Sequence, residues 1–306
     1  MKGWCYVPLK WLLSAVSYMP FGVLYCIADV IFVLAYYVVG YRLKVVKKNI
    51  AESFPEKTAA EQKDIIRKFY RQFADYIVET IKLNHISDEQ MRSRVTFENL
   101  DMIDDLVDKG KSVVVYLSHC GNWEWIPSVT LWTRHRANEG MAFCQVYRPL
   151  KNKWFDEYFL HLRSRFDSLS FQKKTVLRDL LRLRRDNIPS VTGFMSDQKP
   201  SKGDEHFVTM FLNHPTAFIS GTEVIARKLQ MSVVYWDIKK PCRGHYRIVT
   251  KLIAEDASVM PDMEITAEYA RLLEATIRET PHIWLWTHKR WKHKVSLPVT
   301  NIDENK

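Results

Sequence analysis

The stretch SVVVYLSHCGNWE, residues 112–124, decides the fold class. Residues 112–117 form a short apolar run rich in β-branched side chains, which is typical of a strand covered on both faces. Gly121 permits a tight turn after this strand, and Asn122 is a good N-cap for a helix that begins at Trp123. A strand that leads through a turn into a helix is the repeating unit of α/β proteins.

The sequence on both sides of this stretch continues the pattern. We expect further strands at 141–146, 188–195, 233–238 and 246–250, and helices at 58–82, 152–166, 174–185 and 263–280. The predicted fold class is therefore α/β, a mainly parallel mixed sheet flanked by helices. We expect this domain to occupy residues 42–306, after an N-terminal membrane segment at residues 1–41.

The N-terminal segment is strongly apolar. Asp29 is the only charged residue between Trp11 and Tyr41, and residues 21–39 are long enough to cross a hydrocarbon layer of ~30 Å. We expect a membrane helix here, and the alternative is a buried or interfacial hydrophobic hairpin split at Pro20. More basic residues follow the segment than precede it, which places the remainder of the chain on the cytoplasmic face of the membrane.

The composition narrows the class of protein and of partner. The chain has 306 residues with 47% hydrophobic and 26% charged residues, which excludes a disordered chain and a polytopic membrane protein. A net charge of +10 indicates an anionic partner, namely nucleic acid, a lipid surface or a phosphorylated substrate. The five cysteines have no regular spacing, so we expect neither a disulfide framework nor a metal site.

His119 and Glu124 are the candidate catalytic pair. His119 follows the predicted strand at its carboxyl end, where α/β proteins place their active sites. A neutral imidazole removes a proton from a hydroxyl near pH 7, and a carboxylate on its other nitrogen fixes the tautomer. The strand–turn–helix junction allows Glu124 to fold back towards His119. The alternative is a histidine that closes a loop beside an unrelated glutamate. The adjacent Cys120 points to the opposite face of an extended strand and is not expected to act as a nucleophile.

The same stretch carries a family resemblance. Residues 118–124 (SHCGNWE) resemble the HxGNWE block of the bacterial lipid A biosynthesis lauroyl and myristoyl acyltransferases, which belong to the glycerolipid acyltransferase superfamily. Other blocks resemble that family in the same order: RLKVVKKNIAESFP at 42–55, YRPL at 147–150, GFMSDQ at 193–198 and PHIWLWTHKRWK at 281–292. Residues 42–306 would then form the acyltransferase domain.

The resemblance implies an O-acyl transfer without a metal or cofactor. His119, oriented by Glu124, would deprotonate a hydroxyl of a lipid A precursor or a related phosphorylated glycolipid. The hydroxyl would attack the thioester of an acyl carrier protein, which is the expected protein partner. The enzyme would act at the inner membrane of a bacterium, on membrane lipids, and would not bind nucleic acid.

The resemblance also implies a set of substrate-binding residues. Arg148 would bind phosphate or stabilise an oxyanion, and Asp197 would hold the acceptor or Arg148. A buried Arg148–Asp197 ion pair is the alternative. Asn122 and Gln198 complete the predicted set, with a helix cap and a turn as their alternative roles.

Two features leave other substrates and functions open. Residues 185–187 (RDN) and Asn213 stand where the family usually has glycine, so the acceptor is the least determined part. A lysophospholipid or an amino-acid lipid is the alternative acceptor for the same chemistry. Basic and aromatic residues interleave at 284–294, so a non-enzymatic protein that binds nucleic acid or a membrane surface is the alternative from another class.

Overall fold

A seven-stranded sheet forms the centre of the computed structural model, which describes residues 6–135, 139–201 and 203–297. Its strand order is β1-β9-β8-β2-β5-β3-β4. The strands are β1 (Val95–Glu98), β2 (Val113–Leu117), β3 (Ala142–Tyr147), β4 (Leu169–Gln172), β5 (Ser190–Met195), β8 (Ser232–Cys242) and β9 (His245–Ala254). The strands β8, β2, β5, β3 and β4 are all parallel to one another. β9 runs antiparallel to β8, and β1 is parallel to β9. The predicted α/β class with a mixed, mainly parallel sheet is confirmed.

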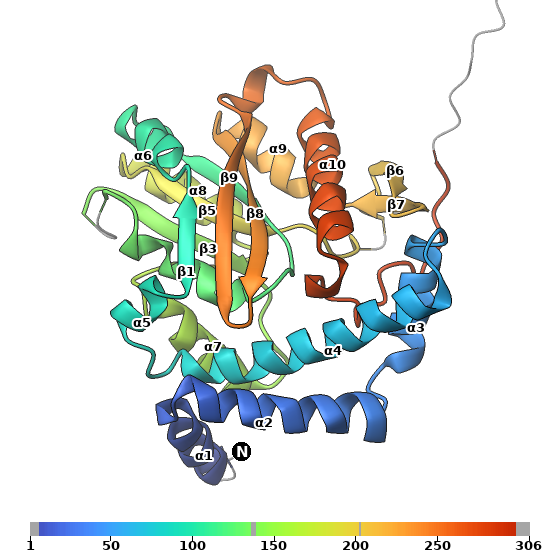
Figure 1. Ribbon diagram of the computed structural model, residues 1–306. Coiled ribbons are helices and arrows are strands. Elements are labelled where there is room, and N and C mark those ends of the chain that lie inside the picture. The colour runs from blue at the N-terminus through green and yellow to red at the C-terminus, as the bar shows by residue number, and fades with distance from the viewer. Residues whose placement is uncertain (1–5, 136–138, 202, 298–306) are drawn as a thin grey trace, which may run out of the picture.

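Helices cover the faces of the sheet and one of its ends (Figure 1). They are α3 (Leu43–Ser53), α4 (Ala59–Lys82), α5 (Asp88–Arg92), α6 (Asp101–Asp108), α7 (Lys153–Ser164), α8 (Val176–Arg185), α9 (Gly221–Lys228) and α10 (Glu264–Glu279). Figure 1 shows β8 pointing towards α4, which crosses the sheet at the carboxyl ends of the parallel strands. The fold therefore presents α4 to the end of the sheet where α/β proteins carry their sites.

The predicted elements agree with the structure, with one change of type. Each predicted strand and helix is confirmed within a few residues, apart from β8 and β9, which run several residues longer than predicted. The helix expected after Asn122 is a 3₁₀ helix, η3 (Trp123–Leu131), rather than an α-helix. Pro127 lies inside it and has no N–H for an α-helical hydrogen bond, which explains the difference. The prediction missed the short strands at 95–98, 169–172, 207–211 and 214–218 and the short helices at 88–92, 101–108 and 221–228. Elements of four to eight residues are too short to show a clear period in the sequence.

Local sequence accounts for the two elements that frame the site. All five residues of β2 are buried, as expected for an apolar strand covered on both faces. At the start of α4, Thr58 and Glu61 form a capping box, in which each side chain binds the other residue's backbone N–H. The buried face of α4 carries Ile65, Ile66 and Phe69 at helical spacing.

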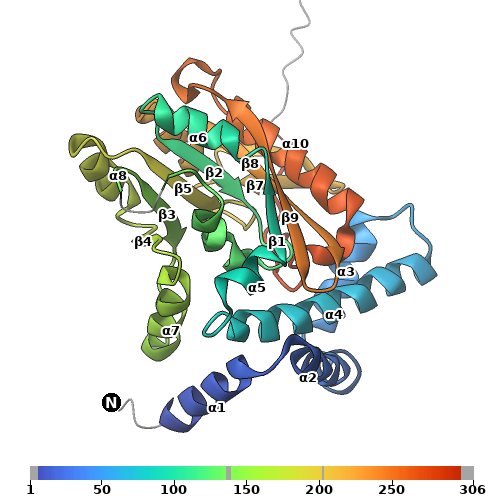
Figure 2. The ribbon, with the colours of Figure 1, turned by 60° about the vertical axis from the view of Figure 1, so that its left-hand side comes forward.

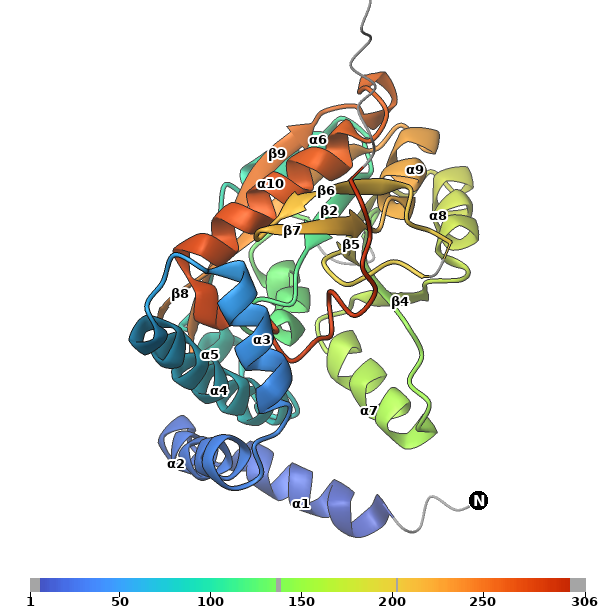
Figure 3. The same cartoon turned by 90° about the vertical axis from the view of Figure 1, so that its right-hand side faces the viewer.

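A two-stranded hairpin lies outside the main sheet, beside α10 (Figure 3). It joins β6 (Phe207–Phe211) to β7 (His214–Phe218) through Leu212 and Asn213, whose φ angles are +50° and +64°. Asn213 tolerates this left-handed conformation better than most residues, and its side chain also donates a hydrogen bond to the Ser53 carbonyl at 3.0 Å. Asparagine at a position where the family usually has glycine is therefore compatible with the turn.

The N-terminal segment forms two helices below α4 (Figure 2). α1 (Val7–Tyr18) and α2 (Phe21–Val33) are separated at Met19, whose ψ angle of 146° ends α1 just before Pro20. α2 continues through a π-helical turn, η2 (Leu34–Val38), and the apolar segment Phe21–Val38 is long enough to cross a membrane, with a mean hydropathy of 2.1. One face of α2 packs along α4 and is buried, at Phe21, Leu24, Ala28 and Phe32.

We predict that Leu24→Ala destabilises the protein and that Val30→Ala does not. Leu24 is fully buried against α4, and removing a buried leucine side chain typically lowers the free energy of unfolding by about 2–5 kcal/mol. Val30 is 60% exposed on the same helix and serves as the matched control. Thermal unfolding of both variants in detergent measures the difference. Equal unfolding temperatures would contradict the packing of α2 on α4.

Candidate active site

His119 and Asp197 lie side by side because of the register between β2 and β5. These parallel strands pair Leu117 with Met195, and each of the two polar residues follows its strand by two positions. The His119 ring nitrogen Nδ1 lies 2.7 Å from the Asp197 oxygen Oδ1. The backbone N–H of His119 donates a second hydrogen bond to Oδ2 of the same carboxylate at 3.0 Å. Asp197 therefore holds His119 through both the imidazole ring and the backbone.

The partners of the imidazole determine its tautomer. An ionised carboxylate only accepts hydrogen bonds, so Nδ1 carries the proton and donates it to Asp197. The other ring nitrogen, Nε2, then accepts a hydrogen bond from the Gln198 side-chain amide at 3.2 Å. This tautomer leaves the lone pair of Nε2 directed away from Asp197, as a general base requires.

Asp197 is an ionised carboxylate in a buried position, with only 2% of its side chain exposed. Burial raises its pKa, but His119 and the hydrogen bonds from His119 and Trp284 outweigh burial and lower it to about 2. The Trp284 indole N–H donates to Oδ2 at 2.9 Å. Trp284 belongs to the tryptophan-rich block after α10, and its backbone forms a bridge with Cys120. The block thus supports the same turn that carries His119.

Glu124 does not make the hydrogen bond to His119 that we expected. Both of its carboxylate oxygens accept hydrogen bonds from Arg163 on α7, at 2.8 Å from Nε and 2.7 Å from Nη2. This two-pronged pairing is the strongest geometry between arginine and a carboxylate. Burial lowers the pKa of Arg163, but the Glu124 charge beside it outweighs burial and raises it overall. In this structure the carboxylate next to the imidazole is Asp197.

Asn122 belongs to the scaffold of the turn. It is buried, its side-chain oxygen accepts from the Glu124 backbone N–H at 3.2 Å, and its amide nitrogen donates to Glu79 at 3.0 Å. These contacts correspond to its alternative role as a helix cap. Gly121 beside it has a φ of +59°, and a Cβ at this position would lie 2.9 Å from the Tyr246 ring. Glycine therefore satisfies both the backbone conformation and the close packing of the turn.

A cavity of about 690 Å³ opens beside His119. Its interior is lined by apolar side chains, which include Val115, Ile126, Phe143, Val191, Phe194 and Trp236. His119, Glu124, Arg163 and Gln198 line it as well, together with the exposed Arg148. Among the described residues, Arg148 makes no ion pair with Asp197, whose two oxygens bind His119 and Trp284. The cavity can hold an apolar chain whose polar end lies at the imidazole.

The thiol of Cys120 is buried, and burial raises its pKa. Because the thiolate is the nucleophilic form of cysteine, Cys120 is unsuited to nucleophilic catalysis. This agrees with the expectation that Cys120 does not act as a nucleophile.

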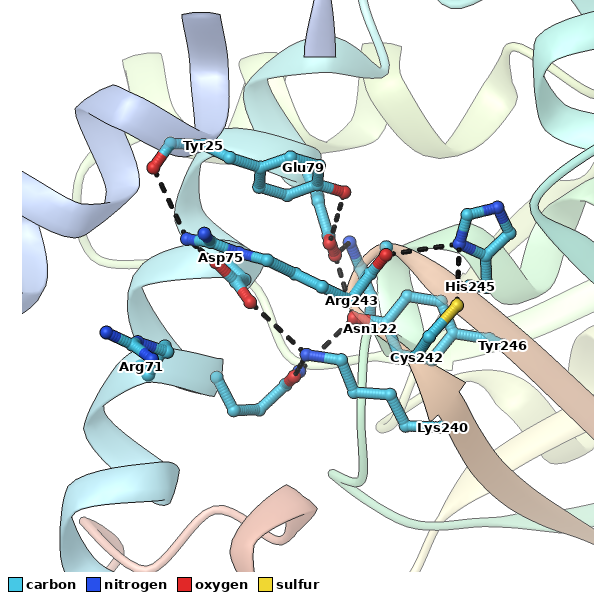
Figure 4. Close-up of polar contacts among 12 residues, drawn as sticks. Tyr25, Arg71, Asp75, Glu79, Asn122, Lys240, Cys242, Arg243, His245 and Tyr246 are labelled. Carbon is cyan, nitrogen blue, oxygen red and sulfur yellow. Dashed lines mark hydrogen bonds and ion pairs between the residues drawn. The ribbon is translucent and has the colours of Figure 1, made fainter. Parts of the chain in front are cut away.

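Sequence reasoning missed three residues that shape the site. Arg163 lies outside every motif, and Trp284 was noted only as part of its block. Glu79 is fully buried on α4 and accepts hydrogen bonds from Asn122, Tyr246 and Tyr25 (Figure 4). Asp75 and Glu79 are four residues apart on a helix whose other buried residues are largely apolar. That spacing was the available signal, since two buried acids on one helix face need polar partners from elsewhere.

We predict that Asp197→Asn lowers stability at neutral pH by on the order of 2 kcal/mol. Because folding lowers the pKa of Asp197 from 3.8 to about 2, its stabilisation is present above pH 3.8 and is lost as the pH falls towards 2. The difference in unfolding temperature between wild type and variant should therefore narrow over that range. A constant difference from pH 7 to pH 3 would contradict an ionised Asp197.

The chain is similar in sequence to known proteins of lipid A biosynthesis. Two proteins of Escherichia coli (strain K12) are each 22% identical to this chain: the lipid A biosynthesis lauroyltransferase over 291 residues and the lipid A biosynthesis palmitoleoyltransferase over 289. The matches cover 94% and 90% of this chain, and 90% and 86% of the two relatives. A lipid A biosynthesis acyltransferase of Shigella flexneri matches at the same 22%.

The family model of the bacterial lipid A biosynthesis acyltransferases matches residues 3–293, which is nearly the whole chain. The match includes the N-terminal helices, the turn with His119, and the tryptophan-rich block that binds Asp197. The chain belongs to the bacterial lipid A biosynthesis acyltransferase family.

Proposed function

We propose that this acyltransferase of lipid A biosynthesis moves a fatty acyl group from an acyl-carrier-protein thioester to a hydroxyl of a lipid A precursor, with His119 as general base. The observation that carries the proposal is the environment of His119. Its Nδ1 binds a buried carboxylate at 2.7 Å, while its side chain lines a largely apolar cavity of about 690 Å³. An apolar chain and a base beside its polar end are the two requirements of this reaction.

The proposed reaction needs one base and no covalent acyl-enzyme. Nε2 of His119 takes the proton of the acceptor hydroxyl while the oxygen attacks the thioester carbonyl carbon. The tetrahedral intermediate then collapses, the carbon–sulfur bond breaks, and the carrier thiolate takes the proton from the imidazolium. Asp197 stabilises the imidazolium between these two steps. Gln198 leaves Nε2 when the hydroxyl arrives and remains available to bind the acceptor.

The proposal gives Asp197 the role that the sequence motif indicates for Glu124. Glu124 and Arg163 instead form a neutral pair in the cavity wall, which keeps an uncompensated charge away from the acyl chain. The exposed Arg148 carries a positive charge at the same cavity, where it suits a phosphate of the acceptor or of the carrier prosthetic group. We further propose that the enzyme works on the cytoplasmic face of the inner membrane.

We predict that loss of the protein removes one acyl chain from lipid A. Cells that lack it, complemented by wild type or by His119→Ala, are compared by mass spectrometry of total lipid A and phospholipids. Wild type should restore the chain and His119→Ala should not, and the mass difference identifies the acyl group. Loss of an acyl group from a phospholipid or an amino-acid lipid would correct the acceptor and keep the chemistry. No change in any lipid would contradict the proposal.

We predict different effects for the two carboxylates on catalysis. Loss of a positioned base or of its orienting carboxylate typically costs about 10²–10⁴ in rate, so His119→Ala and Asp197→Asn should lower kcat by at least ~10². In Asp197→Asn the acid limb of the kcat–pH profile should move to lower pH, because the imidazolium loses its negative neighbour.

The matched control for this prediction is Glu124→Gln. It should keep the wild-type acid limb, since Glu124 binds Arg163 and not the imidazole. If Glu124→Gln moves the limb and Asp197→Asn does not, Glu124 is the partner of His119 during the reaction and our assignment is wrong.

A further inference from the structure

The N-terminal helices have an apolar face that no part of the described chain covers. Opposite its buried face on α4, α2 and its extension expose Val23, Val30, Val33, Leu34 and Val38. α1 continues this surface with further exposed side chains, Val7, Trp11 and Leu12. Figures 2 and 3 show both helices in one layer on the outside of α4. We call this layer the α1–α2 surface.

A three-residue ion pair fastens α2 to the body of the protein. Arg243, in the turn between β8 and β9, donates to Asp29 of α2 at 2.8 Å and to Asp75 of α4 at 2.8 Å. Asp75 is buried, with 1% of its side chain exposed. Arg243 also donates to the Tyr25 backbone carbonyl at 3.3 Å, and Figure 4 shows it between Tyr25 and Asp75. The middle of α2 is therefore held to α4 by charge as well as by apolar packing.

A second polar contact fastens the junction of α1 and α2. The ammonium group of Lys82, at the end of α4, donates hydrogen bonds to the backbone carbonyls of Ser17 and Met19 at 2.9 and 3.0 Å. These carbonyls belong to the break between the two helices, where the helical hydrogen bonds stop. Both the junction and the middle of α2 are thus fixed to the same helix.

These contacts are incompatible with a helix that crosses the bilayer. Asp29 lies halfway along Phe21–Val38, so a crossing helix would carry its charge near the middle of the hydrocarbon layer. There the carboxylate would lose its ion pair with Arg243. α4 cannot follow α2 into lipid, because its outer surface carries Asp64, Arg67, Lys68 and Arg71. An orientation parallel to the membrane keeps every ion pair and still places the apolar face in lipid.

We propose that the α1–α2 surface lies flat in a single leaflet of an anionic bilayer and does not span it. The charges around the surface fit anionic headgroups: Asp29 is the only acidic residue among the first 50, and exposed basic residues flank the two helices, namely Lys10, Arg42, Lys44, Lys47 and Lys48. The mean hydropathy of Phe21–Val38 does not distinguish the two orientations, because it ignores what one face of the helix touches.

The flat orientation also places the cavity next to the lipid, a consequence that rests on the proposed function. The Tyr6 ring, just before α1, stacks on Trp154 of α7 at 5.1 Å between ring centroids, and its hydroxyl accepts from Asn152 at 2.7 Å. α7 carries Arg163, which lines the cavity. A lipid acceptor could then enter the cavity from the leaflet in which α1 lies.

The test is the depth of three labelled positions in the full-length protein. Val23→Cys, Val30→Cys and Val38→Cys are each spin-labelled after Cys5, Cys26 and Cys242 are replaced by serine. The protein is reconstituted in phosphatidylethanolamine–phosphatidylglycerol vesicles, and collision with oxygen and with a nickel chelate reports depth. Because these valines are exposed, the substitutions leave the core intact.

The flat orientation predicts similar depths for all three labels, about 5–10 Å into the boundary of headgroups and acyl chains. A spanning helix would place the label at Val30 close to the midplane, about 15 Å deep, and the other two near opposite surfaces. That result, or three labels exposed to water, would overturn the proposal. The depth measurement needs no acyltransferase activity. A result that overturns the flat orientation therefore leaves the proposed function untouched, and loss of the proposed function leaves the depth result valid.

The headgroup charge is tested by vesicle binding. Lys44→Gln with Lys47→Gln should weaken binding to vesicles that contain phosphatidylglycerol by about fivefold for each charge removed. Lys228→Gln on α9 is the matched control, since this exposed lysine lies on a helix far from the α1–α2 surface (Figure 1). Equal loss in both proteins, or no loss in either, would contradict recognition of anionic headgroups by this surface.

Discussion

The register between β2 and β5 is the constraint on which the candidate active site depends. A parallel pair carries both of its chain ends to the same edge of the sheet, so residues that follow paired positions become neighbours. Leu117 pairs with Met195, and this places His119 beside Asp197 although 78 residues separate them. A shift of one residue in either strand would turn one of the two side chains to the opposite face. Close packing across the pair supports this register, since a Cβ at Gly193 of β5 would lie only 2.8 Å from the Leu117 side chain.

Buried Glu79 connects this site to the rest of the molecule. Its carboxylate accepts hydrogen bonds from Tyr25 of α2, Tyr246 of β9 and Asn122 of the turn after β2, and its backbone carbonyl accepts one from Trp125. Burial raises the pKa of Glu79, which marks how strongly this position disfavours an isolated charge. The hydrogen-bond donors to the carboxylate, with Lys240 nearby, offset only part of the effect of burial. One carboxylate thus joins the N-terminal helix, the sheet and the turn that carries His119.

The two carboxylates near His119 differ because of their partners. Among the described residues, the Asp197 carboxylate accepts hydrogen bonds from His119 and Trp284 and forms no direct salt bridge with an arginine or a lysine, so its charge can act on an imidazolium. Glu124 already compensates a guanidinium, and its charge acts mainly on Arg163. At a cavity wall of low polarity, a matched pair disturbs an apolar ligand less than a single charge. In the proposed reaction Asp197 acts in the chemistry, whereas Glu124 forms part of the cavity wall.

The sequence by itself determined the α/β class, most strands and helices, and His119 at the end of a strand. These features follow from local patterns, namely apolar runs, turn residues and helical spacing, which are contained in a few neighbouring residues. The family resemblance also assigned Asp197 and Gln198 to the substrate-binding residues, but it connected neither of them to His119. Only the tertiary structure decided which carboxylate binds the imidazole, because strand register and the approach of Arg163 on α7 join distant parts of the chain. The same holds for α2: hydropathy measures its composition, whereas its contacts with α4 and Arg243 exist only once the chain has folded.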